Sequence, residues 1–142
     1  MATQAKLYRD TPQIIAPNTW TLLVFDQVLR NDLGMVQDLS LIQPPSDGDF
    51  MWARNIRWEP IIIPEGDERP RQFMARFVRD PHGMPDDTGS DDSLDTPGRD
   101  WGTHMWLFRG NAGQPVGVEV WHDHHIDAVV GHAQFVGQTW DY

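Results

Sequence analysis

The chain has no cysteine among its 142 residues. Disulfides, thiolate metal sites and cysteine nucleophiles are therefore excluded together. Long apolar runs are also absent: the first twenty residues lack the apolar core of a signal peptide. No segment approaches the roughly 20 apolar residues of a membrane-spanning helix. We therefore expect a protein made in the cytoplasm, with neither leader nor membrane partner.

Basic residues are scarce, with 11 Lys and Arg against 21 Asp and Glu, for a net charge of -10. An acidic surface repels phosphate backbones, so we expect no nucleic-acid partner. Hydrophobic residues make up 39% of the chain, as in globular proteins. The length suits a single domain.

Alternating apolar and polar residues predict β-strands, and we find no convincing amphipathic helix. The clearest case is the segment from Phe50 to Trp58, whose large apolar residues fall on even positions. Further strands are expected at 21–29, 35–42, 61–63, 72–79, 102–109, 114–122 and 131–139. Short strands punctuated by Gly and Pro predict an all-β antiparallel sandwich.

We expect two regions in the chain. Residues 1–18 are mostly polar and predict an extended N-terminal arm, either frayed or packed on a neighbouring subunit through Ile14 and Ile15. Residues 19–142 form the β-domain, interrupted by a long Asp-rich loop over 80–100.

Four segments resemble the trimeric globular head of complement's first component, one of the tumour-necrosis-factor-like jelly rolls. An apolar strand with Phe25, Asp26 and Val28 precedes a Pro-Gly turn and an aromatic strand. The segments are LLVFDQVLRND (22–32), LIQPPSDGDFMWARNIRW (41–58), GQPVGVEVWHD (113–123) and AQFVGQTWDY (133–142). Residues 60–105 match poorly, and no collagen-like stalk precedes the domain.

The resemblance implies a jelly roll that forms a homotrimer and binds proteins or glycans without being an enzyme or needing a cofactor. In phages, similar modules serve as capsid decoration proteins, which would place this chain in the virion against the major capsid protein or another virion protein. A head-fibre or tail-fibre tip is the alternative. The residues expected at a trimer or partner interface are Ile14, Ile15, Trp121, Trp140 and Tyr142.

A histidine cluster supports a third hypothesis, a cupin-like metal-dependent enzyme. His122 and His124 would face one side of a strand, and a turn could bring His132 near, which suits a transition metal. The glutamate that follows His-x-His in cupins is absent here. The alternative is a polar loop between two strands.

Two further features have a functional and a structural interpretation. The stretch from Asp86 to Asp95 offers oxygen ligands for calcium, or is a solvated loop, since its spacing is not that of an EF-hand. An arginine-rich middle segment is either a docking face for an acidic partner or a set of cross-strand ion pairs. Trp52 and Trp58 are expected in the core.

Overall fold

The computed structural model describes residues 2–63, 65–66, 71–83, 86–87, 93–94 and 102–140. These residues form β-strands and one short 3-10 helix, and none of them belongs to a helix able to cross a membrane. The elements are β1 (Ala2–Arg9), β2 (Gln13–Ile15), β3 (Thr21–Leu22), β4 (Gln27–Asn31), η1 (Asp32–Gly34), β5 (Val36–Gln37), β6 (Leu41–Ile42), β7 (Gly48–Trp58), β8 (Phe73–Arg79), β9 (Asp86–Asp87), β10 (Ser93–Leu94), β11 (Gly102–Gly110), β12 (Val116–His122) and β13 (Ala128–Trp140).

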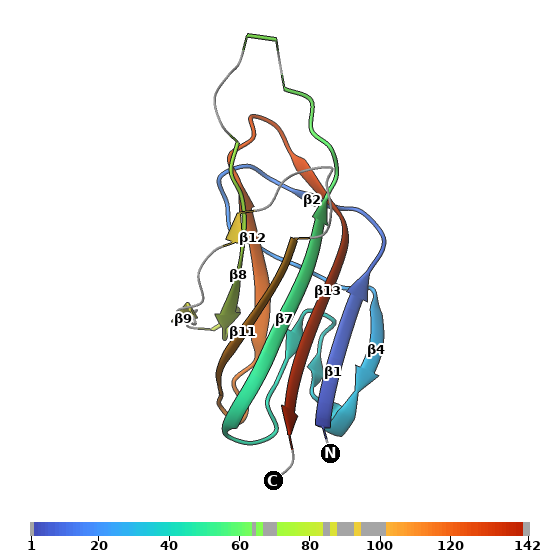
Figure 1. Ribbon diagram of the computed structural model, residues 1–142, viewed down its shortest axis with the longest axis vertical. Helices are drawn as coiled ribbons and strands as arrows, with labels where there is room; N and C mark the ends of the chain where they lie inside the picture. The colour runs from blue at the N-terminus through green and yellow to red at the C-terminus, as the bar shows by residue number, and fades with distance from the viewer. Residues whose placement is uncertain are drawn as a thin grey trace.

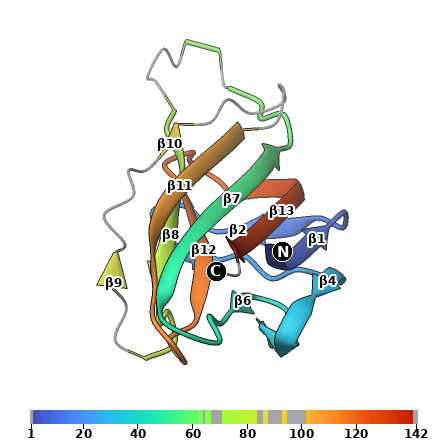
Figure 2. The ribbon, with the colours of Figure 1, turned by 60° about the horizontal axis from the view of Figure 1, so that its bottom comes forward.

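The strands form two antiparallel sheets packed face to face (Figures 1 and 2). Sheet A has the order β11-β7-β13-β1-β4, and β2 pairs with the first three residues of β13. Sheet B has the order β10-β8-β12-β6-β5, with β3 paired to β12 and β9 to β8. This arrangement confirms the predicted all-β antiparallel jelly-roll sandwich.

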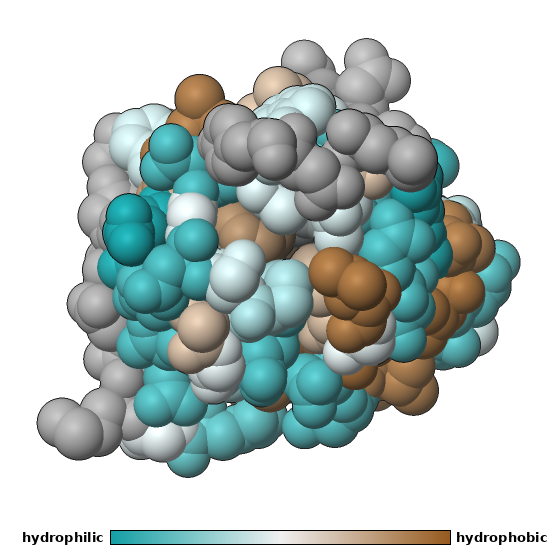
Figure 3. All heavy atoms as spheres, turned by 90° about the horizontal axis from the view of Figure 1, so that it is seen from below, coloured by the Kyte–Doolittle hydropathy of each residue, from teal (hydrophilic) through white to brown (hydrophobic). Residues whose placement is uncertain are grey.

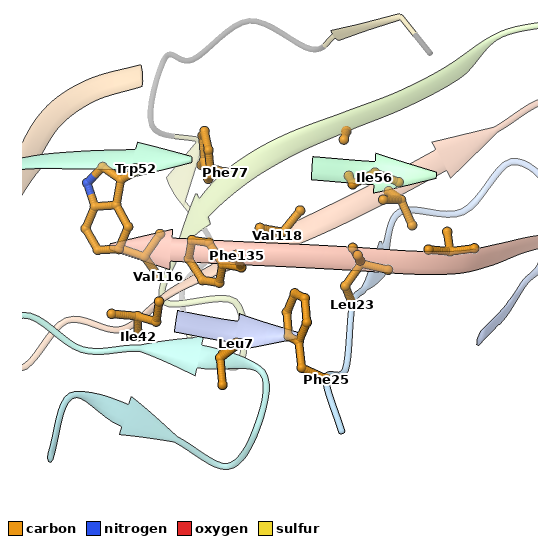
Figure 4. Close-up of a cluster of buried hydrophobic side chains, with 14 of the residues drawn as sticks. Leu7, Leu23, Phe25, Ile42, Trp52, Ile56, Phe77, Val116, Val118 and Phe135 are labelled. Carbon is orange, nitrogen blue, oxygen red and sulfur yellow. The ribbon is translucent and has the colours of Figure 1, made fainter. Parts of the chain in front are cut away.

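The core lies between the sheets and is strongly aromatic (Figure 4). Trp52 of β7 stacks on Phe108 at 5.1 Å and on Phe135 of β13 at 5.9 Å between ring centroids. Trp52 and Trp58 are both buried, as their alternation in the sequence predicted. Aromatic contacts of this kind add to the apolar area that each ring buries.

The expected N-terminal arm is wrong for residues 2–9. β1 lies inside sheet A, paired with β13 on one side and β4 on the other. Ala5 and Leu7 of this strand are fully buried in the core. The residues that alternate with them are mostly polar and face outward. This central strand therefore has a polar composition, which is why it was mistaken for an arm.

Three predicted strands also differ from the structure. The segment 35–42, expected as one strand, forms β5 and β6, which pair with each other. The segment expected as one strand over 21–29 is divided into β3 and β4, because the chain crosses from sheet B to sheet A between them while burying Leu23 and Phe25. Residues 61–63 form no strand, and Ile62 is 85% exposed. Pro60, which lacks a backbone donor, ends β7 at this point.

Candidate functional site

The outer face of sheet A is the broad surface that faces the viewer in Figure 1. Side chains alternate between its two faces, so every second residue of each strand projects away from the core. Aligned by the strand register, the outward side chains are Thr103, Met105, Leu107 and Arg109 of β11; Asp49, Met51, Ala53, Asn55 and Arg57 of β7; His132, Gln134, Val136, Gln138 and Trp140 of β13; and Ala2, Gln4, Lys6 and Tyr8 of β1.

This face is nearly free of carboxylates, although the chain contains 21 Asp and Glu. Asp49 is the one acidic side chain in the set above, and it lies directly across from Arg109 in the strand register. At the β4 edge, the carboxylate of Asp32 accepts hydrogen bonds from the backbone of Gln4 and from Arg30, both at 2.9–3.0 Å. These bonds lower the pKa of Asp32 from its ordinary value, mainly through Arg30. The outer face is therefore neutral to slightly positive on an acidic molecule.

An apolar hollow of about 610 Å³ lies on this face, at the β11 side. Its lining is Met51, Met105, Trp106, Leu107 and Trp140. Leu107 is 73% exposed and Met105 is 59% exposed, in a strand whose other face, with Trp106 and Phe108, packs against the core. Large apolar side chains gathered on one exposed face mark an interaction surface.

Sequence reasoning predicted Trp140 for an interface but missed Met51, Met105 and Leu107. The signal that could have found Met105 and Leu107 is the unbroken apolar run Met105-Trp106-Leu107-Phe108, and Met51 lies in the similar run Phe50-Met51-Trp52. In a strand with one solvated face, apolar and polar residues alternate. A strand with apolar residues on both faces is typical of one that is covered on both sides.

The other predicted interface residues lie in different surroundings. Ile14 of β2 is 68% exposed, but Ile15 is fully buried in the subunit's own core and is not accessible to a partner. Trp121 lies on the outer face of sheet B, 6.4 Å from Trp20 between ring centroids, and Trp20 carries the guanidinium of Arg76 at 3.9 Å. Tyr142 lies outside the described residues.

The predicted metal ligands do not converge. His122 is buried, and both of its ring nitrogens are engaged: Nε2 with the carbonyl of Ile15 at 2.7 Å and Nδ1 with the backbone N–H of His124 at 3.1 Å. His132 lies on the outer face of sheet A, paired with Arg57. Among the described residues, no group of three His, Cys, Asp or Glu side chains could hold a metal ion.

The arginines of the middle segment do not form one docking face. Arg54 points into the core, where its Nη2 donates to the carbonyl of Ala75 at 2.9 Å and its guanidinium lies 4.5 Å from the centre of the Phe77 ring. Arg76 pairs with Glu119 at 2.8 Å on sheet B. The cross-strand pairing interpretation is thus confirmed for Arg76. The calcium hypothesis falls on a stretch of which only β9 and β10 are described.

A second exposed apolar cluster follows the β4 edge. Val28, Leu29 and Leu33 are all exposed, and Leu33 adopts a left-handed backbone with φ of 56°. In Figure 3 apolar residues gather toward the right of the view, the side on which Figure 1 draws β4. This cluster adjoins the outer face of sheet A rather than lying on it.

No protein-family model matches the sequence, and no curated protein matches it. Solved structures do match. One is the crystal structure of murine APRIL at pH 5.0, with a TM-score of 0.60 and 7% sequence identity over 96% of this chain and 99% of that chain. APRIL is a tumour-necrosis-factor family member. At this identity the likeness shows the fold alone: this chain is an antiparallel jelly-roll sandwich similar to that of APRIL.

Proposed function

We propose that the protein is a non-enzymatic structural module that assembles as a homotrimer through the outer face of sheet A. The observation that carries this proposal is the composition of that face. It combines exposed Met105, Leu107 and Trp140 with neutral amides, and Asp49 is the one carboxylate in the described rows of that face.

Charge supports self-association at this face in particular. Each subunit carries a net charge of -10, so any contact rich in carboxylates would repel its own copy. The outer face of sheet A avoids that repulsion, and its apolar hollow offers area to bury. Interface cores elsewhere are likewise poor in charge and rich in Trp and Met.

We further propose that the trimer is a phage virion protein that decorates the capsid. A trimer presents each remaining surface three times, so that a weak contact to a capsid protein is strengthened by multivalency. The resemblance described above and the single small cysteine-free domain support this role. Its location would then be the mature virion.

The assembly is tested by light scattering on a sizing column. We expect a mass of about three times 16.3 kDa for the wild type. Leu107→Glu, which places a carboxylate in the apolar hollow, should give a folded monomer. Circular dichroism checks the fold of each variant.

Leu33→Glu is the matched control, since Leu33 is as exposed as Leu107 but lies outside the rows of the face. It should remain trimeric. A monomeric wild type, or equal dissociation by both variants, would contradict the proposed interface.

The virion role is tested by co-sedimentation with assembled empty capsids of the phage that encodes the chain. The wild-type trimer should pellet with the shells, and the Leu107→Glu monomer should bind at least about tenfold more weakly because multivalency is lost. No binding by a confirmed trimer would exclude decoration and leave the assembly proposal intact.

One observation favours a fibre tip as the second candidate. Both termini lie at one end of the molecule, and the loop of residues 60–63 and the turn 123–127 lie at the other (Figure 1). That distal end displays Ile62, Ile63 and Ile126 as exposed side chains. Attachment at the termini would present these loops outward, and binding to host-cell envelopes rather than to capsids would identify this role.

A further inference from the structure

The turn that follows β12 is held by two buried histidine rings. His122 is fully buried between the sheets, stacked on Phe73 at 5.5 Å and edge-on to Trp58 at 5.9 Å between centroids. His124 is 1% exposed. The His122 ring, at the end of β12, thereby contacts β7 and the start of β8, and its Nε2 reaches the carbonyl of Ile15 in β2.

The hydrogen bonds of His122 require a neutral ring. The carbonyl of Ile15 can only accept, so Nε2 must carry the proton and donate. The backbone N–H of His124 can only donate, so Nδ1 must keep its lone pair. A second proton on Nδ1 would remove the acceptor that holds the turn.

His124 is constrained in the same way. Its Nδ1 accepts a hydrogen bond from Nε of Arg71 at 3.3 Å. Arg71 is always charged, so it can only donate. A proton on Nδ1 of His124 would therefore replace this bond with repulsion between two cations.

The charged groups around the rings come from the turn itself, from the residue after β7 and from the segment before β8. Arg71 precedes β8, and His125 packs edge-on against His124 at 4.4 Å between centroids. Glu59 after β7 and Asp127 of the turn line a hollow of about 190 Å³ together with His124. The Asp123 carboxylate accepts a hydrogen bond from the backbone of Gln72 at 2.7 Å, and β2 contributes only uncharged residues.

We propose that His122 and His124 form an acid-sensitive latch that closes the distal end of the subunit. At neutral pH the latch ties the turn 123–127 to β2 and to the start of β8. Protonation of His124 replaces its hydrogen bond from Arg71 with repulsion between two cations. The turn 123–127 then loosens, while β2, which is paired with β13, and the centres of both sheets stay folded. The latch acts within one subunit and does not depend on the proposed trimer.

The pH direction follows from His124. Its pKa is lowered from 6.5, first by burial and then by His125, Arg71 and His122, with Asp123 opposing. The unfolded turn therefore binds protons more readily than the folded turn. Closure is fully stable above the unfolded pKa, and its stability falls as the pH drops below about 6.5.

Hydrogen–deuterium exchange measured at about pH 7 and about pH 5, corrected for intrinsic rates, tests the latch. Residues 122–128 should lose at least about tenfold in protection at the lower pH, whereas residues 13–15 of β2 and 50–56 of β7 should change less than about twofold. Unchanged protection of residues 122–128 would overturn the proposal.

One variant assigns the effect to His124. His124→Gln keeps an acceptor for Arg71 but cannot take up a proton. It should reduce the pH-dependent loss of protection by at least about threefold. His82→Gln is the control, because His82 is 62% exposed and lies far along the chain from the turn. Its pH response should equal the wild type; a response reduced as much as in His124→Gln would overturn the latch.

Discussion

Arg54 is a cation enclosed by the aromatic core, and its side chain is 1% exposed. Its guanidinium lies against the Phe77 ring and donates to the carbonyl of Ala75, while its aliphatic stem fills space between the sheets. Burying a charge is costly unless such partners replace water. Two contributions therefore depend on this residue: the polar contacts of its head and the packing of its stem.

Substitution separates the two contributions. Arg54→Met keeps most of the volume and should lower the free energy of unfolding by about 1.5–3 kcal/mol, the range for a lost hydrogen bond to a charged group. Arg54→Ala also creates a cavity and should cost about 3–5 kcal/mol. Urea denaturation followed by tryptophan fluorescence, at fixed protein concentration, gives both values. Equal losses for the two variants would show that the stem contributes no packing.

The sequence could not have predicted the burial of Arg54 or the role of the buried His122. Arg54 falls on an even position of β7, the same face as Trp52 and Trp58, so its side was predictable from the alternation. Its burial was not, because arginines in strands usually face solvent. His122 lies in a pattern equally typical of a metal site, and only the positions of Ile15 and His124 distinguish the two.

β13 is the central element of sheet A, because it pairs with β7, β1 and β2. Gly137 faces inward on this strand, directly opposite Trp52. A Cβ at Gly137 would lie 2.8 Å from Cζ3 of Trp52 and 3.1 Å from Cγ2 of Ile42. The glycine therefore allows the indole ring to lie flat against the β13 backbone.

Gly137→Ala should lower the free energy of unfolding by about 1–3 kcal/mol, since the added methyl overpacks the core. Gly48→Ala is the matched control: it starts β7, and a Cβ there meets nothing within 4 Å. That variant should be neutral, or more stable by up to about 1 kcal/mol. Thermal unfolding followed by near-ultraviolet circular dichroism measures both. Equal effects at the two glycines would mean that Trp52 moves aside freely.

At the scale of elements, prediction succeeded where one face of a strand is plainly apolar. β7, β8, β12 and β13 were expected within a few residues of their true bounds. β1 was taken for an arm because its inward residues include the small Ala5, which gives a weak alternation signal. Its place in sheet A depends on pairing with β13, whose residues lie more than a hundred positions away in the sequence. A local sequence pattern carries no information about such a distant partner.

The distribution of charge is a property of the whole molecule. A net charge of -10 on each chain means that the subunits of the proposed trimer would repel one another at long range. The outer face of sheet A, the proposed interface, carries only Asp49 as a carboxylate in its described rows. The proposed trimer is therefore held by apolar burial and opposed by distant charge. Salt screens only the second of these, with a Debye length of about 10 Å at 0.1 M ionic strength.

Raising sodium chloride from about 20 mM to about 300 mM should tighten the trimer, because screening removes repulsion without weakening apolar contacts. Sedimentation equilibrium at several protein concentrations gives the association constant, which we expect to rise by about tenfold or more across this range. Neutral sucrose at matched density serves as the control for solution effects other than screening. A trimer that instead dissociates with salt would show that ion pairs hold the interface. The contact would then have to lie on a charged surface, and not on the outer face of sheet A.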